Sequence, residues 1–377
     1  MIVRKPPMGW NSWNTFGANI DEDLIKETAD AMVSSGLLDA GYEYLVIDDC
    51  WAERERDRNG RMVPDAKKFP HGMKAVADYV HSKGLKFGMY SCCGNLTCAG
   101  FPGSFDYEFI DAASFAEWGV DYLKYDYCFR PMTQEGHLLY KRMGLALANC
   151  GRDIVFSACS WGADKTNEWI KMTGAHLWRS TGDINDSWQS VKELALKQQD
   201  YFTTNGKGCF NDMDMLIVGM NGKGNVAVSG CTDQEYRTHF SLWAFLGSPL
   251  MIGCDVRNMS EATKETLLNK AVIAVNQDEG YRQPFRCGHH WNHAEVPVWA
   301  KMLENGDIAL GAFNLSDGFS DPFISFDTLG LNRATGKALA LTDLWTGEEI
   351  GVYKDIFRFK AIPAHGCVML RAKVVDA

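Results

Sequence analysis

The feature that most constrains the fold of this 377-residue chain is an alternation of short apolar segments with amphipathic segments, repeated eight times. The apolar segments have strand lengths and end on polar or acidic residues; they lie at 8–13, 44–49, 85–90, 122–126, 154–159, 176–179, 209–214 and 250–255. The segments with helical periodicity lie at 20–35, 72–83, 109–118, 137–150, 166–173, 188–201, 234–246 and 260–275. Because eight such units close into a barrel of parallel strands, the pattern predicts an α/β fold, the (β/α)₈ TIM barrel.

A doubly wound open sheet is the competing fold with the same alternation. Such a sheet normally has a Gly-rich phosphate-binding loop after its first strand, and the segment 8–17 contains no such loop. The near-continuous apolar strands also suit a sheet that is buried on both faces. We therefore expect the closed barrel.

The pattern changes after residues 276–280, where long helical segments stop. Strand-like segments follow at 298–302, 307–314, 338–344 and 366–371, and the turn signals Asn305-Gly306 and Thr346-Gly347 lie between them. This predicts a smaller C-terminal antiparallel β-sandwich domain. We place the catalytic barrel at residues 1–282 and the β domain at residues 283–377.

Composition and charge exclude several classes of partner. A formal net charge of −10 without a cluster of Lys and Arg argues against nucleic acid. No stretch approaches the roughly 20 apolar residues of a membrane span. The N-terminus has no signal-peptide pattern, so we expect a cytoplasmic protein with mostly reduced cysteines. The sequence shows no exposed apolar stripe that would mark a subunit interface, so it does not decide between a monomer and a homo-oligomer.

The histidines give no metal signal. The one cluster, His289, His290 and His293, lacks nearby carboxylate or Cys ligands and is typical of a surface turn. We therefore expect neither a metal nor another cofactor.

The strand ends carry the chemistry, because the active site of such a barrel lies at the carboxyl ends of its strands. The residues at these positions are Trp13, Asp48, Asp49, Tyr90, Lys124, Asp126, Arg179, Asp183, Asp214 and Met215. The set is acidic and holds neither His nor a Ser with a base beside it. Paired carboxylates of this kind are typical of glycoside hydrolysis. The alternative is a magnesium site built from Asp48, Asp49, Asp126 and Asp214.

The fourth strand ends on Asp126, and Lys124 projects to the same face because strand side chains alternate. A lysine beside a carboxylate favours the ionised form, as a nucleophile requires. Taken alone, the two residues are more typical of an ion pair at the surface than of a catalytic centre.

Several motifs at these strand ends carry a family resemblance. They are MGWNSW (8–13), IDDCW (47–51), TCAGFPGS (97–104), LKYD (123–126), WR (178–179) with GDINDSW (182–188), and DMDM (212–215). In this order they resemble the α-galactosidase/α-N-acetylgalactosaminidase (melibiase) family of retaining glycoside hydrolases. The match runs from Met8 to about Asp278, and the family fold is a (β/α)₈ barrel followed by an antiparallel β domain.

The resemblance implies an exo-acting double displacement on terminal α-linked, galactose-configured sugars of oligosaccharides or glycans. Asp126 matches the nucleophile and Asp183 the acid/base, and the carboxyl groups of such a pair lie about 5–5.5 Å apart. The residues alone leave open that Asp183 or Asp186 caps the following helix instead.

The resemblance also assigns the sugar contacts. Asp48 and Asp49 would accept hydrogen bonds from the 4- and 6-hydroxyls, and Trp13 would stack on the apolar face of the ring. Lys124 and Asp214 would hold the 3- and 2-side of the sugar ring, and Arg179 would bond a hydroxyl near the 2-position. Tyr90, Cys98 and Met215 would line the pocket. Cys98 and Cys128 match a pair that is disulfide-bonded in relatives, although a reducing cytoplasm would keep them as thiols.

One segment departs from the family pattern. Where α-galactosidases of the family commonly read Cys-Glu-Trp, this chain has Cys159-Ser160-Trp161-Gly162-Ala163. The resemblance relates Ser160 and Ala163 to the N-acetylgalactosaminidases, in which the vacated space holds the 2-acetamido group. We therefore expect a preference for α-N-acetylgalactosamine.

A plain α-galactosidase is the alternative, in which Asp164 or a water replaces the lost acceptor. A β-L-arabinopyranosidase and a non-catalytic sugar-binding barrel are the remaining alternatives. The presence of Asp at both 48 and 49 speaks against the first, and the presence of Asp126 and Asp183 against the second.

Overall fold

A computed structural model of the chain describes residues 3–198 and 206–377. Its largest sheet has eight parallel strands in the order β10-β1-β2-β3-β4-β5-β6-β8. These strands are β1 Met8–Asn11, β2 Tyr44–Val46, β3 Lys86–Cys92, β4 Tyr122–Asp126, β5 Val155–Cys159, β6 Leu177–Arg179, β8 Phe210–Asp212 and β10 Leu250–Ile252. Seven of the eight predicted strand segments contain one of them, and the segment 85–90 falls two residues short of the end of β3.

The sheet closes on itself, as the sequence predicts. The last strand pairs in parallel with the first, with Met8 opposite Leu250. Beside β8, Leu216 continues the sheet to β10: its amide donates to Met251 O at 2.7 Å, and its carbonyl accepts from Gly253 N at 2.9 Å. The predicted (β/α)₈ barrel is therefore confirmed.

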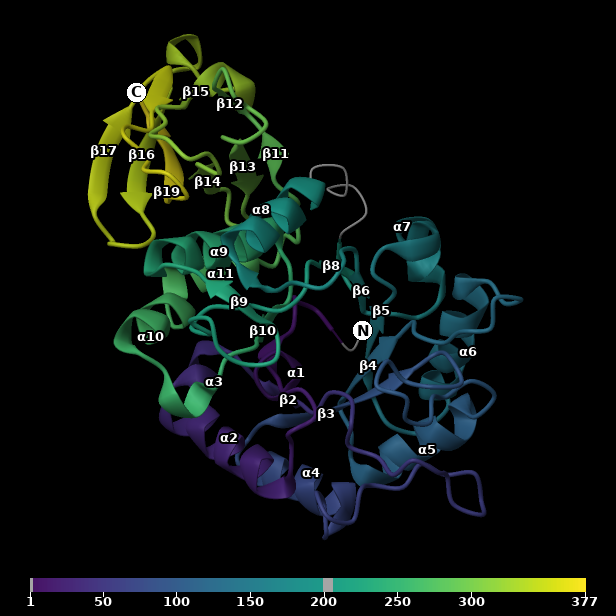
Figure 1. Ribbon diagram of the computed structural model, residues 1–377. Helices are drawn as coiled ribbons and strands as arrows, with labels where there is room; N and C mark the ends of the chain where they lie inside the picture. The colour runs from purple at the N-terminus through teal and green to yellow at the C-terminus, as the bar shows by residue number, and fades with distance from the viewer. Residues whose placement is uncertain (1–2, 199–205) are drawn as a thin grey trace.

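Helices surround the strands on the outside (Figure 1). They are α1 Trp13–Phe16, α2 Glu22–Ser34, α3 Leu37–Ala40, α4 Gly72–Ser82, α5 Glu108–Trp118, α6 Gly136–Ala148, α7 Thr166–Trp169, α8 Trp188–Lys197, α9 Asp233–Leu246, α10 Glu261–Leu267 and α11 Lys270–Asn276. The 3₁₀ turns η1 Ala163–Lys165 and η2 Ile170–Met172 flank α7, and η4 Val256–Asn258 precedes α10. A short parallel pair, β7 Asp186–Ser187 and β9 Ala227–Gly230, lies outside the barrel sheet.

Three predicted helices differ from the observed ones. The segment 260–275 is two helices, because Asn269 interrupts it and caps α11 by accepting from Val272 N at 3.0 Å. The segment 166–173 is only one α-turn, α7, followed by the 3₁₀ turn η2. In the segment 188–201, α8 ends at Lys197 and residues 199–201 lie outside the described residues.

The C-terminal part is the predicted antiparallel β-sandwich. One sheet has the order β11-β13-β14-β19-β16-β17 and the other β12-β15-β18. Their bounds are β11 Phe285–Arg286, β12 Gly288–His289, β13 Val298–Met302, β14 Ile308–Phe313, β15 Phe323–Ser325, β16 Lys337–Asp343, β17 Glu349–Tyr353, β18 Ile356–Arg358 and β19 Cys367–Asp376, with 3₁₀ turns η5 Phe326–Leu329 and η6 Arg333–Thr335.

The barrel and the sandwich share apolar packing. Phe245 of α9 stacks on Trp299 of β13 with ring centroids 6.5 Å apart and meets Phe313 of β14 edge-on at 5.7 Å. Helix α9 therefore lies between the two parts, and Figure 1 shows it with α8 beneath the strands of the sandwich. The predicted boundary between residues 282 and 283 falls in the segment that connects α11 to β11. Among the described residues, no helix is both long and apolar enough to cross a membrane.

Candidate active site

A cavity of about 210 Å³ opens at the carboxyl ends of the barrel strands. It is lined by these predicted residues: Trp13, Asp48, Asp49, Tyr90, Cys98, Lys124, Asp126, Cys128, Arg179, Asp183, Asp214 and Met215. The parallel register explains how strand ends far apart in the sequence meet here, since Asp126 lies opposite Cys92 on one side and Cys159 on the other.

Asp126 is the last residue of β4 and is only 6% exposed. The amide of Tyr127 donates to its Oδ1 at 2.9 Å, and the hydroxyl of Tyr90 donates to its Oδ2 at 3.2 Å. Burial raises the pKa of Asp126 to about 6, although the charge of Lys124 opposes this shift. Above that pH the carboxylate is ionised and held in one orientation, as an attacking group needs to be.

Lys124 forms its ion pair with a different carboxylate from the one expected. Its Nζ lies 2.8 Å from Asp48 Oδ2, and Asn11 Nδ2 donates to the same oxygen at 2.7 Å. Burial opposes the positive charge of Lys124, but nearby acidic groups, Asp48 first among them, outweigh it and raise the pKa of the ammonium. Lys124 therefore acts on Asp126 through space, and its direct partner is Asp48.

Asp49 forms the neighbouring wall, and two backbone amides and the Thr97 side chain hold it. Its Oδ1 accepts from Cys50 N at 2.7 Å and its Oδ2 from Ala99 N at 3.0 Å. Burial raises the pKa of Asp49, and the Ala99 hydrogen bond works against that rise. Each of the two adjacent carboxylates thus has a fixed orientation toward the cavity.

On the opposite side, Arg179 joins two carboxylates. Its Nη2 lies 2.6 Å from Asp214 Oδ2 and 2.8 Å from Asp183 Oδ1. The side chain of Asp183 is 78% exposed, whereas that of Asp214 is 9% exposed. Burial raises the pKa of Asp214 to about 6 against the pull of Arg179. The exposed carboxylate is the one that can exchange protons with a leaving group and with water.

The helix that follows Asp183 does not use it as a cap. Helix α8 begins at Trp188, and its N-cap is Ser187, whose side chain accepts from Ser190 N. Asp186 is buried and accepts from Gly222 N at 2.6 Å and from the Tyr236 hydroxyl at 2.8 Å. Neither aspartate is therefore the cap of α8.

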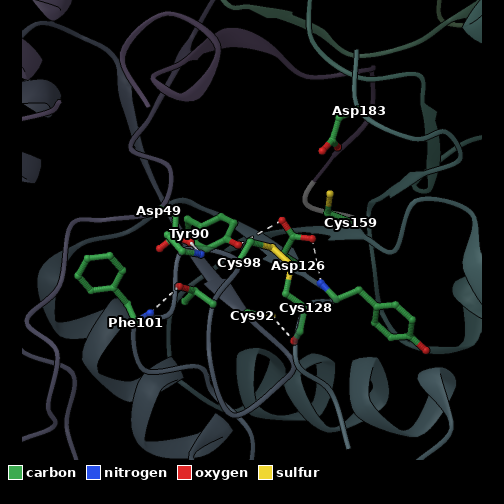
Figure 2. Close-up of a disulfide and its surroundings, with 12 residues drawn as sticks. Asp49, Tyr90, Cys92, Cys98, Phe101, Asp126, Cys128, Cys159 and Asp183 are labelled. Carbon is green, nitrogen blue, oxygen red and sulfur yellow. Dashed lines mark hydrogen bonds between the residues drawn. A yellow bond between two sulfur atoms is a disulfide. The ribbon is translucent and has the colours of Figure 1, made fainter. Parts of the chain in front are cut away.

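The cysteines at the cavity are joined. Cys98 and Cys128 form a disulfide, which closes the loop after β3 onto the residue that lies two positions after Asp126. Figure 2 shows this disulfide beside Asp126, with Asp49 and Tyr90 on one side and Cys159 on the other. Its two sulfur atoms and Asp126 are the one group of potential ligand atoms spaced for a metal in the described chain, and a disulfide leaves no thiolate to bind one. The magnesium alternative has no support, because Asp48 pairs with Lys124 and Asp214 with Arg179.

Ser160 and Ala163 do not lie where the sequence places them. Ser160 is fully buried with its Oγ 2.6 Å from Thr166 Oγ1, and neither residue belongs to the cavity lining; Trp161 of the same loop does. Asp164 does not replace the missing acceptor either, since its Oδ2 accepts from Tyr127 at 2.5 Å and lies 3.1 Å from Arg130. The backbone is left-handed at Trp161, Gly162 and Asp164, so this loop follows neither a helix nor a strand.

Sequence reasoning missed four lining residues: Asn14, Trp161, Ile184 and Val226. Trp161 follows the end of β5, so an aromatic residue at a strand end was an available signal. Asn14 and Ile184 each follow a predicted residue directly. Val226 comes from the long segment after β8, where no strand end marks it.

A closed (β/α)₈ barrel whose strand ends bring carboxylates together around one cavity, with a β-sandwich behind it, defines a glycoside hydrolase. Comparison with known protein families identifies the family of glycoside hydrolases. Residues 5–278 match the model described as alpha galactosidase A, and residues 293–372 match the alpha galactosidase C-terminal beta sandwich domain. The chain belongs to the α-galactosidase (melibiase) family.

Individual relatives agree with this assignment. The α-galactosidase of Cyamopsis tetragonoloba is 46% identical over 91% of this chain and 80% of its own length. The α-galactosidase A of Cellvibrio japonicus is 43% identical over 98% of this chain and 92% of its own. The structure of the Saccharomyces cerevisiae α-galactosidase with raffinose is 29% identical and superposes with a TM-score of 0.88 over 99% of this chain and 98% of its own.

Proposed function

We propose that this chain is an exo-acting retaining α-galactosidase with Asp126 as nucleophile and Asp183 as acid/base. The observation that carries the proposal is the pairing of a buried, oriented Asp126 with an exposed Asp183 around one cavity. At about 210 Å³ the cavity is smaller than the roughly 300–1,000 Å³ of drug-sized sites. That size suits a single sugar ring, and hence removal of one terminal residue.

In the first step, an oxygen of Asp126 attacks the anomeric carbon while Asp183 protonates the departing glycosidic oxygen. In the second, Asp183 removes a proton from water, which attacks the anomeric carbon and releases Asp126. Asp126 is ready for its role at neutral pH because its pKa is about 6. Asp183 needs a proton in the first step, and a sugar hydroxyl that binds Arg179 would compete for the Nη2 group that now contacts Asp183.

The sugar is proposed to be galactose, which corrects the preference expected from sequence. That expectation depended on Ser160 and Ala163, and neither side chain belongs to the cavity lining. The relatives described above are named α-galactosidases, and one of them was solved with raffinose, a galactose-containing oligosaccharide. An α-galactoside of an oligosaccharide is therefore the substrate class that we propose.

The test is a comparison of nitrophenyl α-galactoside with its 2-acetamido counterpart and with nitrophenyl β-L-arabinopyranoside. We expect the highest kcat/KM on the galactoside, with the α-anomer of galactose as the first product by NMR. A higher value on the 2-acetamido substrate would identify an N-acetylgalactosaminidase. An absence of turnover on all three, with galactose still bound, would identify a sugar-binding barrel.

A further inference from the structure

The C-terminal sandwich reaches the helix that follows the acid/base loop. Helix α8 begins five residues after Asp183, and Figure 1 shows it next to the sandwich strands. Two of its residues, Trp188 and Lys192, contact the sandwich. They are four positions apart and so lie on one face of the helix.

Both contacts are specific. The ring of His365, in the loop before β19, stacks on Trp188 with centroids 4.5 Å apart and planes 23° apart. Lys192 pairs with Glu295 of the segment before β13. The side chain of Lys192 is 18% exposed and that of Glu295 36%, so this pair is partly shielded from solvent. The sandwich therefore covers the first turn of α8 at two points.

His365 is itself held firmly. Its Nδ1 lies 2.6 Å from Glu235 Oε1 and its Nε2 lies 3.0 Å from Asp317 Oδ1. Its carbonyl accepts from the Thr238 hydroxyl at 2.7 Å. Glu235 also closes the capping box of α9, so the imidazole is tied to a barrel helix while its face lies against α8. Such contacts fix the plane of the ring, and the ring fixes Trp188.

The loop from 182 to 187 also has hydrogen bonds of its own: the Gly182 carbonyl accepts from Arg179 Nη2 at 2.8 Å, Asn185 N donates to Ser190 Oγ at 3.1 Å, and Asp186 N donates to Val226 O at 2.9 Å. Ile184 N donates to Asp214 Oδ2 at 2.7 Å, and Asp186 accepts from Gly222 N and Tyr236. Asp183 has an exposed side chain whose contact here is Arg179. Its position thus depends on how the backbone on both sides of it is held. An acid must be placed within a fraction of an ångström to protonate a leaving group efficiently.

We propose that His365 is a positioning residue for acid catalysis: it fixes Trp188, and through Trp188 the loop that carries Asp183. The β-sandwich thereby contributes to the reaction without touching the sugar. This inference rests on the proposed role of Asp183.

The test is the dependence of kcat/KM on the leaving group in the full-length His365→Asn variant. Asparagine tolerates the left-handed backbone at this position, where φ is 59°. Acid assistance matters for a poor leaving group and little for a dinitrophenolate. We expect kcat/KM on dinitrophenyl α-galactoside to stay within about twofold of wild type. On methyl α-galactoside we expect a fall of about tenfold or more, a part of the 10²–10⁴ that general acid catalysis supplies.

Three further variants make the result interpretable. Asp183→Asn gives the full leaving-group dependence, and Trp188→Leu removes the other partner of the stack and should resemble His365→Asn. Trp345→Phe is the matched control. Trp345 contacts Ser241 and Arg237 of α9, so its substitution weakens the same interface at a place away from α8. It should lower the melting temperature without changing the ratio between substrates.

Equal losses on both substrates in His365→Asn, or no loss, would overturn the inference. If Asp183→Asn itself shows no leaving-group dependence, the assignment of Asp183 is wrong and the inference falls with it. Circular dichroism and melting temperature of each variant separate these outcomes from misfolding.

Discussion

The buried position of Asp126 disfavours the negative charge of its carboxylate. The side chain is almost fully buried, and burial holds its pKa near 6 although Lys124 opposes the shift. The pKa of Asp126 is higher in the folded state than its unfolded value of 3.8, so this group favours folding most below pH 3.8. That contribution to stability is lost as the pH rises through 6. The shift corresponds to a cost on the order of 2–3 kcal/mol at neutral pH.

The variant Asp126→Asn should therefore lose turnover and gain stability. Removing the proposed nucleophile should lower kcat by at least about 10³-fold. The neutral amide avoids the charge penalty, so the melting temperature should rise by a few degrees at pH 7.5. The gain should fade as the pH falls toward 4, because the wild-type carboxyl is then protonated. Calorimetry at several pH values and a nitrophenol assay measure the two effects.

Tyr90→Phe provides the comparison at the same site, because it removes the hydroxyl that donates to Asp126 Oδ2 and leaves the carboxylate in place. It should keep measurable turnover. Wild-type rates in Asp126→Asn would show that another residue is the nucleophile.

At the scale of single elements, the strands of the barrel and their chemistry were predictable. The end of β4 at Asp126 and that of β6 at Arg179 are visible as apolar runs that stop on charged residues. What lies within the loops was not. Ser160 meets Thr166 across a loop in which four residues adopt left-handed backbone. Lys124 pairs with Asp48 because that carboxylate, just after β2, lies within its reach. Neither contact leaves a periodic signal in the sequence.

The short strands of the sandwich escaped prediction for a related reason. Strands β11, β12 and β18 have two or three residues each and are partly exposed, so no alternation can develop in them. Their partners define them: β12 exists because Gly288 and His289 pair with β15.

The disulfide between Cys98 and Cys128 should support both stability and binding. It closes a loop with a sequence separation of 30, and loop-closure entropy gives it a value of about 3–4 kcal/mol. The loop also carries Ala99, whose amide orients Asp49. The double variant Cys98→Ser/Cys128→Ser should therefore melt at a lower temperature and show a higher KM.

Treatment with dithiothreitol separates the effect of losing the disulfide from the effect of the two serine substitutions. It should shift the wild type toward the double variant and leave the double variant unchanged. No response in the wild type would mean that the two cysteines are reduced in the active enzyme.

For the whole molecule, the junction of the barrel and the sandwich contains a buried lysine. Lys301 of β13 is 2% exposed, and its Nζ donates to Val275 O near the end of α11 at 2.7 Å. A cation at the C-terminal end of a helix is favoured by the helix dipole. Burial nevertheless lowers the pKa of Lys301 to about 8. The junction thus holds a charge that is solvated poorly.

Replacing Lys301 by Met should change how stability depends on pH. Between pH 8 and 10.5 the folded wild type binds fewer protons than the unfolded chain, so its stability rises with pH in that window. The advantage of Lys301→Met, after the lost hydrogen bond is counted, should be greatest near pH 7 and shrink toward pH 10. Calorimetric melting at pH 7, 8, 9 and 10 measures this difference.

Lys373→Met is the control, because Lys373 is an exposed lysine on β19 of the same domain. Its effect on the melting temperature should not vary across this range. A constant difference for Lys301→Met as well would mean that the buried ammonium is not titrating in the fold.

The central claim, a covalent intermediate on Asp126, is tested most directly by trapping that intermediate. A slow substrate such as 5-fluoro-α-galactosyl fluoride should add one sugar to the protein, because the fluorine slows release more than attack. Peptide mass spectrometry should then locate the sugar on Asp126. A sugar on Asp183 or Asp214, or no covalent adduct while the compound is still hydrolysed, would contradict the account.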